Sequence, residues 1–257
     1  MMDVLKIQVS KDQLLAMPTS ERALFILLGY AANQLSLFSK LVIFSTNRIP
    51  GDEVEGTLSG AQTQMLLRMV IGVLHETWVK IITNRLMKSP LAKDYLPRLD
   101  QQGRDALEAL NKLFGGSNLL NKIRNSYSFH HPYDEDVEAA FLLAASNPGL
   151  DSEWVWYFST SNFNSLYFVS EFVILHGILK EIGEQDLNAA QEHLMVEVRT
   201  ALNEITTLIM ALTSAIWRKH FGNEFRAVVC AKIPPDAPNL FEFWLPFLVK
   251  VPDGTIS

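Results

Sequence analysis

Apolar side chains recur along this chain at steps of three and four residues, and this spacing is the strongest constraint on its fold. Residues three and four apart share one face of an α-helix, so the pattern predicts helices with one buried face. The clearest run covers residues 19–47, where Thr19 and Ser20 supply capping chemistry and Pro50-Gly51 supplies a stop. Its apolar positions are Leu24, Leu27, Leu28, Ala31, Leu35, Phe38 and Val42.

The same reasoning predicts further helices along most of the chain. Their ranges are roughly 59–88, 102–114, 118–130, 134–145, 162–182 and 187–220. Ser89-Pro90, Gly115-Gly116 and Pro132 end the first three, because glycine and proline disfavour the continuation of a helix. Long helices joined by short turns predict an all-α fold, an up-and-down helical bundle with long helices.

The last part of the chain has a different composition. Residues from Phe225 to Ile256 include five prolines and the aromatic cluster Phe241-Glu242-Phe243-Trp244. The prolines predict an irregular tail, and the aromatic side chains predict that it packs against the helices. We therefore expect a helical bundle domain over 1–224 and a C-terminal extension over 225–257. The segment Trp154 to Phe158 has strand-like composition but is too short to predict a sheet.

Cysteine content and hydropathy bear on the compartment. The single cysteine, Cys230, excludes an intramolecular disulfide and a cysteine-based zinc site, and it is expected to be a small core residue. No signal peptide is evident at the N-terminus. The apolar stretch from Leu166 to Leu179 contains Glu171 and His176, so it is expected to be a buried helix rather than a membrane span, with His176 hydrogen-bonded in the core. These features predict a cytoplasmic protein with no membrane association.

Charge is unevenly distributed. The net charge of −6 disfavours broad electrostatic adhesion to nucleic acid. From Glu76 to Arg124 there are nine Lys/Arg and five Asp/Glu, whereas from Asp134 to Glu204 there are two Lys/Arg and 13 Asp/Glu. The balances are +4 and −11. A localised basic surface can therefore exist beside an acidic, solvated one.

The segment between these two regions, Ile123 to Pro132, gathers the residues best suited to chemistry. It contains Arg124, Asn125, His130 and His131 within ten positions. A neutral histidine can remove the proton from a ribose 2′-hydroxyl, and an arginine can hold the phosphate and stabilise its transition-state charge. Asn125 can position the sugar or phosphate by hydrogen bonding. The alternative is structural, because histidines in a last turn also stabilise a helix C-terminus through its dipole.

Helix geometry separates the two histidines. At 100° per residue, Arg124 and His131 fall within about 20° of each other, with Tyr127 on the same side. His130 instead aligns with Ile123. A regular helix therefore pairs His131 with Arg124, whereas a helix that unwinds before Pro132 lets His130 take that place. The sequence leaves both histidines as candidates.

Arg124-Asn125 followed by Phe129-His130, near the end of a helix in an all-helical chain, resembles the signature of the HEPN superfamily. In that superfamily an arginine, a polar residue and then a histidine occur in a helical bundle, with four to six positions between the arginine and the histidine. Five positions separate Arg124 from His130, and six separate it from His131. The resemblance favours His130. It implies a metal-independent endoribonuclease whose site lies in a cleft between two protomers, often in toxin–antitoxin or phage-defence systems.

We therefore expect catalytic roles for Arg124, Asn125 and His130 or His131, and RNA contacts from Lys122, Arg124 and Tyr127. No metal or other cofactor is expected, and the implied partners are a second copy of the chain, RNA and an antitoxin-like protein. A non-catalytic helical dimerisation or interaction module is the alternative. A third hypothesis is a small-ligand protein with a closed apolar pocket lined by Phe241, Phe243 or Trp244.

Overall fold

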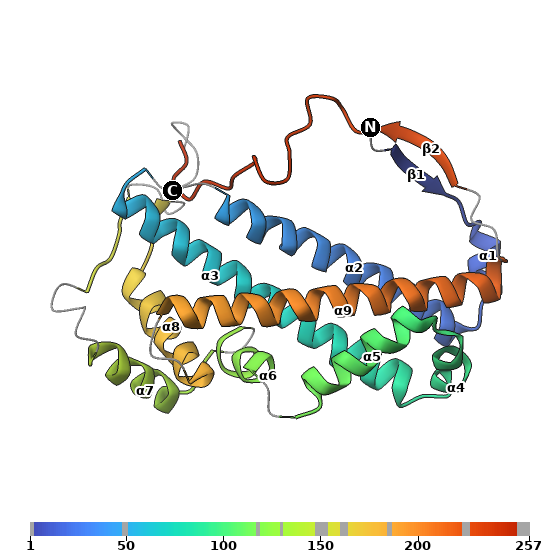
Figure 1. Cartoon of the computed structure of the whole chain (residues 1–257), viewed down its shortest axis with the longest axis horizontal. Helices are drawn as coiled ribbons and strands as arrows, with labels where there is room; N and C mark the ends of the chain where they lie inside the picture. The colour runs from blue at the N-terminus through green and yellow to red at the C-terminus, as the bar shows by residue number, and fades with distance from the viewer. Residues whose placement is uncertain are drawn as a thin grey trace. The chain divides into compact units, whose positions relative to one another are not determined.

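The computed structural model describes residues 3–47, 51–116, 119–128, 131–146, 154–159, 164–183, 187–222 and 227–250. The chain divides into two compact units built from non-consecutive segments. Unit 1 comprises Met1–Ser36, Val73–Gly116 and Thr200–Asn239, and unit 2 comprises Leu37–Gly72, Ser117–Arg199 and Leu240–Ser257. Helices dominate both units (Figure 1), so the predicted all-α helical bundle is confirmed. Each unit also contains part of the predicted 225–257 extension.

Three long helices contribute residues to both units. They are α2 (Thr19–Thr46), α3 (Glu53–Glu76) and α9 (Leu187–Phe221). The predicted ranges 19–47 and 187–220 agree closely with α2 and α9. Leu24, Leu28 and Leu35 on α2 are each at most 2% exposed, so the predicted apolar face is the buried one.

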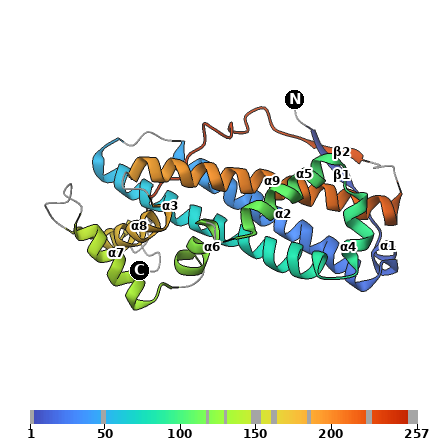
Figure 2. The same ribbon diagram turned by 60° about the horizontal axis from the view of Figure 1, so that its bottom comes forward.

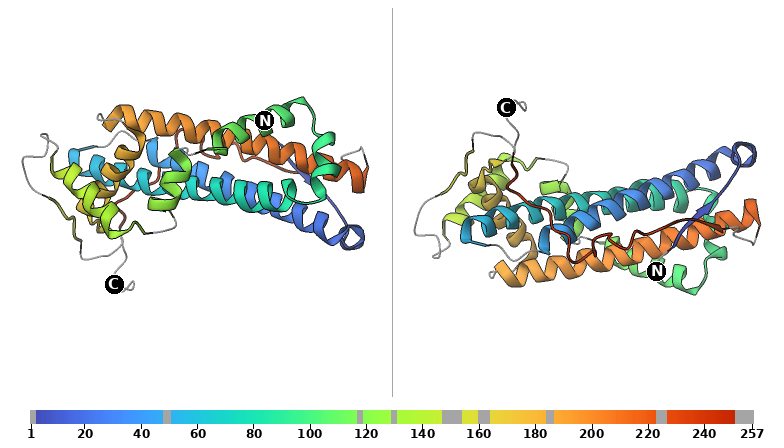
Figure 3. Two further views of the ribbon diagram at one scale, coloured as in Figure 1. Left: turned by 90° about the horizontal axis from the view of Figure 1, so that it is seen from below. Right: turned by 90° about the horizontal axis from the view of Figure 1, so that it is seen from above.

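Unit 1 adds several short elements to its parts of α2 and α9. They are β1 (Asp3–Ile7), α1 (Lys11–Ala16), the π-helix η1 (Thr77–Met87), α4 (Leu91–Tyr95), the 3₁₀-helix η2 (Leu96–Arg98), α5 (Gln101–Phe114) and β2 (Ala227–Lys232). Asp100 caps α5 by accepting a hydrogen bond from the backbone N–H of Gly103 at 2.8 Å. A Cβ atom at Gly103 would lie 2.5 Å from Cβ of Ala211, so only glycine allows α5 to approach α9 this closely (Figures 2 and 3).

The helix predicted over 59–88 begins earlier in the structure and changes from an α-helix to a π-helix. Its first part is α3, and its last part is the π-helix η1. The buried residues of η1 are Thr77, Trp78, Ile81, Ile82 and Leu86. These positions recur at four and five residues, which suits the wider π-helical turn better than a period of 3.6. Trp78 stacks on Phe114 of α5, with ring centroids 5.4 Å apart.

The prediction that the chain is irregular after Phe225 is partly wrong. Its first part forms β2, which pairs antiparallel with β1 at the other end of the chain, Asp3 opposite Lys232 and Ile7 opposite Ala227. Cys230 on β2 is exposed, not a core residue as predicted, and its Sγ donates to the Val4 carbonyl at 3.3 Å. A two-stranded ribbon has little core of its own, which explains the exposure.

Unit 2 contains α6 (Leu119–Ile123), the π-helix η3 (Arg124–Ser128), α7 (Asp134–Ala145) and α8 (Phe168–Ile182) beside its parts of the long helices. The range predicted for α7 is confirmed, whereas α8 begins later than the predicted residue 162. Helix α7 packs along α8 (Figure 1), with Ala140, Ala144 and Val173 in their shared core. An ion pair at 2.6 Å between Arg68 and Glu171 joins α3 to α8.

Two further expectations for unit 2 can be compared with the structure. His176 is buried on α8 and its Nδ1 donates to the Phe172 carbonyl at 2.9 Å, which confirms a hydrogen-bonded core histidine. In the strand-like segment, Tyr157 forms an isolated antiparallel bridge with Leu166.

The rest of the tail contacts helices within unit 2. The Phe243 ring meets Phe44 edge-on with centroids 4.7 Å apart, and the Leu245 N–H donates to the Phe44 carbonyl at 2.9 Å. Asn47 Nδ2 donates to the carbonyls of Leu240 and Phe243 at 2.8 and 2.7 Å. Polar backbone contacts thus hold this segment against the end of α2.

Among the described helices, α2 is long and apolar enough to span a membrane by length and composition alone. Only 22% of its most apolar window is buried in the structure. A signal sequence near the N-terminus passes the same test, and a single helix of this kind is weak evidence for a span.

A buried carboxylate joins three elements of unit 1. Glu21 near the start of α2 is 6% exposed, and it accepts hydrogen bonds from the Tyr95 hydroxyl, from His220 Nε2 at 2.5 Å and from Lys219 Nζ at 3.0 Å. Lys219 also contacts Asp94 at 3.3 Å. The N-terminal turn of α2, the end of α4 and the last turn of α9 therefore meet around one charge.

These contacts shift the pKa values of the cluster. Burial by itself would raise the pKa of Glu21, but hydrogen bonds from Tyr95, His220 and Lys219 outweigh it and lower the pKa below its ordinary value. Burial and the hydrogen bond to Glu21 raise the pKa of Tyr95. Burial would lower the pKa of Lys219, but its contacts with Glu21 and Asp94 raise it. The cluster therefore contains ionised Glu21, protonated Lys219 and neutral Tyr95 near neutral pH.

The Glu21→Gln variant is expected to lower the free energy of unfolding at neutral pH by about 1–3 kcal/mol, because a neutral amide leaves buried donors poorly matched. A carboxylate whose pKa is lower in the folded protein than in the unfolded chain stabilises the fold at pH values above its unfolded pKa, about 4.3. This contribution is lost as the pH falls through the pKa of the folded protein. The difference between wild type and variant in urea unfolding should therefore shrink below about pH 4.

Glu108→Gln is the matched control, because Glu108 pairs with Lys112 in the same unit at 3.2 Å but both side chains are largely exposed. Its effect should be close to zero. A difference between Glu21→Gln and wild type that does not change with pH would contradict the role assigned to the Glu21 charge.

Candidate functional site

The Ile123–Pro132 segment begins on two short, consecutive helical pieces of unit 2. Leu119, Leu120 and Ile123 of α6 are buried, so this side of the helix is fixed in the core. Arg124 is half-buried and Asn125 is exposed. The apolar anchoring of α6 therefore directs the two polar residues towards solvent.

Arg124 and Asn125 interact directly. Nη1 of Arg124 donates to Oδ1 of Asn125 at 3.0 Å. This contact fixes the amide so that its NH₂ group faces away from the guanidinium.

The helix is not α-helical at the functional candidates. From Arg124 to Ser128 it forms the π-helical turn η3, and Ser128 Oγ donates to the Ile123 carbonyl, five residues earlier, at 3.5 Å. The helix predicted over 118–130 is therefore present over the described residues 119–128, but its second half is a π-helix instead of a regular α-helix. The alignment of Arg124 with His131 assumed 100° per residue, and that assumption fails where the turn widens.

The histidines follow the end of this turn. His131 is exposed, and residues 131–133 are not helical. Phe129 and His130 lie outside the described residues, so the assignment of His130 stays a prediction. Pro132 precedes the extended Tyr133, which is the N-cap of α7. The His131 side chain is therefore accessible to solvent.

Tyr127 has a structural position rather than the RNA contact predicted for it. Its side chain is 8% exposed, and its hydroxyl lies so close to α8 that a Cβ at Gly177 would be 2.5 Å away. Burial, together with the negative charges of Asp136 and Glu181, raises its pKa to about 12. A ring held this way offers no face for stacking on a base.

Lys122, the other predicted RNA contact, is engaged as well. Its Nζ pairs with Glu181 of α8 at 2.9 Å, and its side chain is 44% exposed. A partly exposed ion pair is weak, so a phosphate can compete with Glu181 for this lysine. Lys122 and Arg124 remain the cations of the segment.

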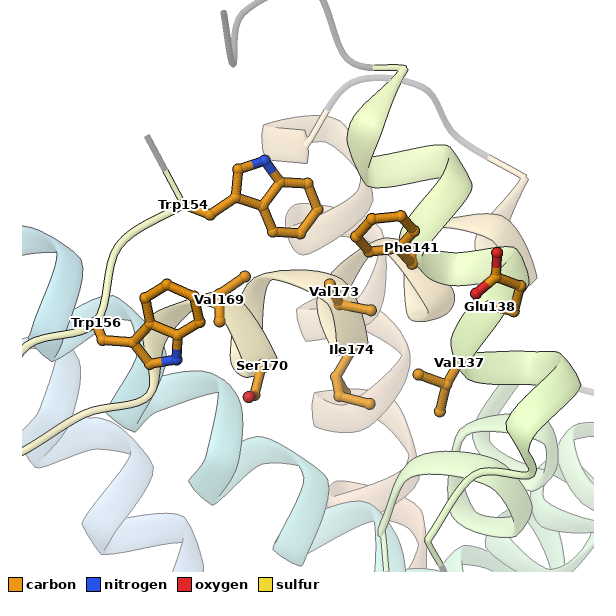
Figure 4. Close-up of a pocket in the computed structure, with 9 residues that line it drawn as sticks. All are labelled: Val137, Glu138, Phe141, Trp154, Trp156, Val169, Ser170, Val173 and Ile174. Atoms are coloured by element: carbon orange, nitrogen blue, oxygen red, sulfur yellow. The ribbon is translucent and has the colours of Figure 1, made fainter. Parts of the chain in front are cut away.

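Sequence reasoning missed an aromatic cavity of about 530 Å³ between α7 and α8 (Figure 4). Its walls are Val137, Glu138, Phe141, Trp154, Trp156, Val169, Ser170, Val173 and Ile174. The third hypothesis placed a closed pocket at Phe241, Phe243 or Trp244, but none of these lines this cavity. The Trp-Val-Trp pattern at 154–156 was the available signal, because it places two indoles on one side of an extended segment.

Comparison with protein-family models, curated proteins and solved structures gives no match for this chain. In the part of the chain that the structure describes, no three His, Cys, Asp or Glu side chains gather as metal ligands.

The Gly177→Ala variant is expected to lower the free energy of unfolding by about 1–3 kcal/mol, because the added methyl group would overlap the buried Tyr127 ring. Combining it with Tyr127→Phe should recover part of the loss, since the closest atom is the phenol oxygen. Urea unfolding followed by circular dichroism measures both effects.

Gly60→Ala provides the control, because Gly60 lies on α3 in the same unit and a Cβ there meets no atom within 4 Å. It should be neutral or stabilising by up to about 1 kcal/mol. Equal effects of the two substitutions would show that Tyr127 is not packed against Gly177.

Proposed function

We propose that this chain binds and cleaves RNA at the segment Arg124–His131, as a metal-independent endoribonuclease similar to the HEPN superfamily. The observation that supports this most is the π-helical turn that begins at Arg124. Such turns are rare and occur frequently at functional sites, where they interrupt the regular hydrogen bonding of a helix. Here the turn contains Arg124 and Asn125, two of the residues selected on chemical grounds.

The accessibility of the residues also supports the proposal. Arg124 is half-buried, whereas Asn125 and His131 are exposed. A partly buried guanidinium is held in place and less solvated than a fully exposed one, which strengthens its hydrogen bonds to a phosphate. Arg124 would hold the scissile phosphate in a bidentate contact, and Asn125 would orient the nucleotide.

In this mechanism a histidine acts as the general base. His130 or His131 would take the proton of the ribose 2′-hydroxyl, whose oxygen then attacks the adjacent phosphorus. The phosphorus–oxygen bond to the next nucleotide breaks, and the leaving 5′-oxygen takes a proton from the protonated histidine or from water, giving a 2′,3′-cyclic phosphate and a 5′-hydroxyl end. The guanidinium of Arg124 would stabilise the added charge on the phosphoryl oxygens.

Arg124→Ala, His130→Ala and His131→Ala are to be assayed for cleavage of a mixed panel of single-stranded and structured RNAs in EDTA. Loss of the general base should lower the rate about 10²–10⁴-fold. Loss of Arg124 should lower it about 10²–10³-fold. The histidine with the larger effect is the base, and the new ends should be cyclic phosphates.

His193→Ala is the matched control, because His193 is a partly exposed histidine on α9 in the same unit, paired with Glu197 at 3.4 Å. It should retain full activity. Undiminished cleavage in Arg124→Ala and in both histidine variants would exclude this site. Cleavage that EDTA abolishes would exclude the metal-independent mechanism.

A second function, a non-catalytic dimerisation module, is favoured by the surface of α2. Ile26, Tyr30 and Leu37 on this helix are 57%, 58% and 55% exposed. No charged residue occurs between Arg22 and Lys40. Exposed apolar side chains along an uncharged helix are typical of a protein interface.

Tyr30→Arg is expected to shift this protein from dimer to monomer, because a charge at an apolar contact must be desolvated without a partner. Sedimentation velocity across a concentration series measures the change. Leu142→Arg, on the exposed face of α7 at 58% exposure, is the control and should leave the mass unchanged. A wild-type chain that is monomeric throughout the series would exclude this function.

A further inference from the structure

The cavity between α7 and α8 has the size and lining of a small-molecule site. Its volume of about 530 Å³ lies within the range of ligand pockets, roughly 300–1,000 Å³. Val173 at its base is 8% exposed and belongs to the packed core with Ala140 and Ala144. The base of the cavity is therefore fixed by the packing of the two helices.

Aromatic rings form much of its wall. Trp154 and Phe141 lie with ring centroids 5.0 Å apart at an interplanar angle of 40°. Trp156 lines the cavity as well (Figure 4) and is 49% exposed. Burying an exposed indole is favourable, and Trp156 is half exposed to water. A bound molecule that covers Trp156 would therefore gain free energy from apolar contact.

The charge around the cavity selects the kind of molecule. Among the described residues of the wall, Glu138 is the one that is ionisable, and it comes from α7 (Figure 4). The sequence of α7 contains Asp134, Glu135, Asp136 and Glu138 and no Lys or Arg. On α8, the carboxylate of Glu171 is paired with Arg68 outside the wall. The field at the cavity is thus negative, which disfavours a phosphate or carboxylate ligand.

We propose that this cavity binds an organic cation, an ammonium group joined to an apolar body. The ammonium would lie against the aromatic rings of the wall, where cation–π attraction acts, and Glu138, one turn before Phe141 on α7, would supply the opposite charge. The apolar body would lie on Val169, Val173 and Ile174. This proposal does not depend on RNA cleavage, because neither Arg124 nor His131 is among the described residues that line the cavity.

Three probes with one apolar body test the preference for a cationic head: hexyltrimethylammonium, 1-hexanol and hexanoate. Isothermal titration calorimetry of the full chain should give about tenfold tighter binding for the cation than for the alcohol. Hexanoate should bind more weakly than the alcohol. Equal affinities for the three probes would show that the cavity binds apolar molecules without regard to charge. Tightest binding of hexanoate would point to an anionic ligand such as a nucleotide. Either result overturns the proposal, as does absence of cation binding.

Variants locate the binding site. Glu138→Gln changes an exposed residue and should narrow the preference for the cation over the alcohol several-fold, without changing the affinity for 1-hexanol. Trp154→Ala should weaken binding of all three probes. Phe158→Ala, an aromatic residue that is 69% exposed in the same segment but outside the wall, should change nothing. If Glu138→Gln keeps the full preference for the cation over the alcohol, the charge pairing assigned to Glu138 is wrong. This test holds even if Trp154→Ala unfolds the region.

Discussion

The polar end of unit 1 depends on one buried carboxylate. Without Glu21, the Tyr95 hydroxyl, His220 Nε2 and Lys219 Nζ would lose the acceptor that they share. Burying a charge costs several kcal/mol, and only a full set of donors offsets it. The three elements that supply Glu21 and its donors are far apart in the sequence, so the cluster also specifies which helix ends meet. Apolar packing along α2 allows small sliding movements, whereas a hydrogen-bonded carboxylate accepts one arrangement.

The parts of this fold that are local in sequence could be predicted, and the parts that depend on distant residues could not. The α7 range follows from Pro132 before it and from the acidic first turn, which complements the helix dipole. By contrast, β1 and β2 are separated by more than 200 residues and neither has a buried face to reveal it. Cys230 was assigned to the core because of its residue type alone. The residue type does not reveal that Cys230 lies on an exposed two-stranded ribbon. The contact between His220 and Glu21 joins residues near opposite ends of the chain, so no local pattern predicts it.

The candidate site shows the same division. The sequence selected Arg124, Asn125 and the histidines by their chemistry, and the structure gives Arg124 a direct contact with Asn125. The predicted helix geometry of this segment was wrong. The pairing of Arg124 with His131 assumed a regular period of 3.6 residues, and the alternative assumed unwinding just before Pro132, but the turn already widens at Arg124. Tyr127 was assigned to RNA because it shares a face with Arg124 in an ideal helix, yet Gly177 on α8 leaves space that its ring fills. No pattern within the segment itself contains that information.

The two proposed sites of unit 2 impose opposite electrostatic demands within a short stretch of chain. RNA at Arg124 requires positive charge, whereas α7, which begins three residues after His131, carries the acidic residues that favour a cation. Asp136 is close enough to raise the pKa of Tyr127, so its field reaches the η3 turn. Lys122 in turn neutralises Glu181 at 2.9 Å, which limits the negative potential on the α8 side. A polyanion would therefore approach Arg124 from the side away from α7, with its affinity falling steeply as salt is added. A small cation at Glu138 involves one exposed charge, and its binding would fall only gently.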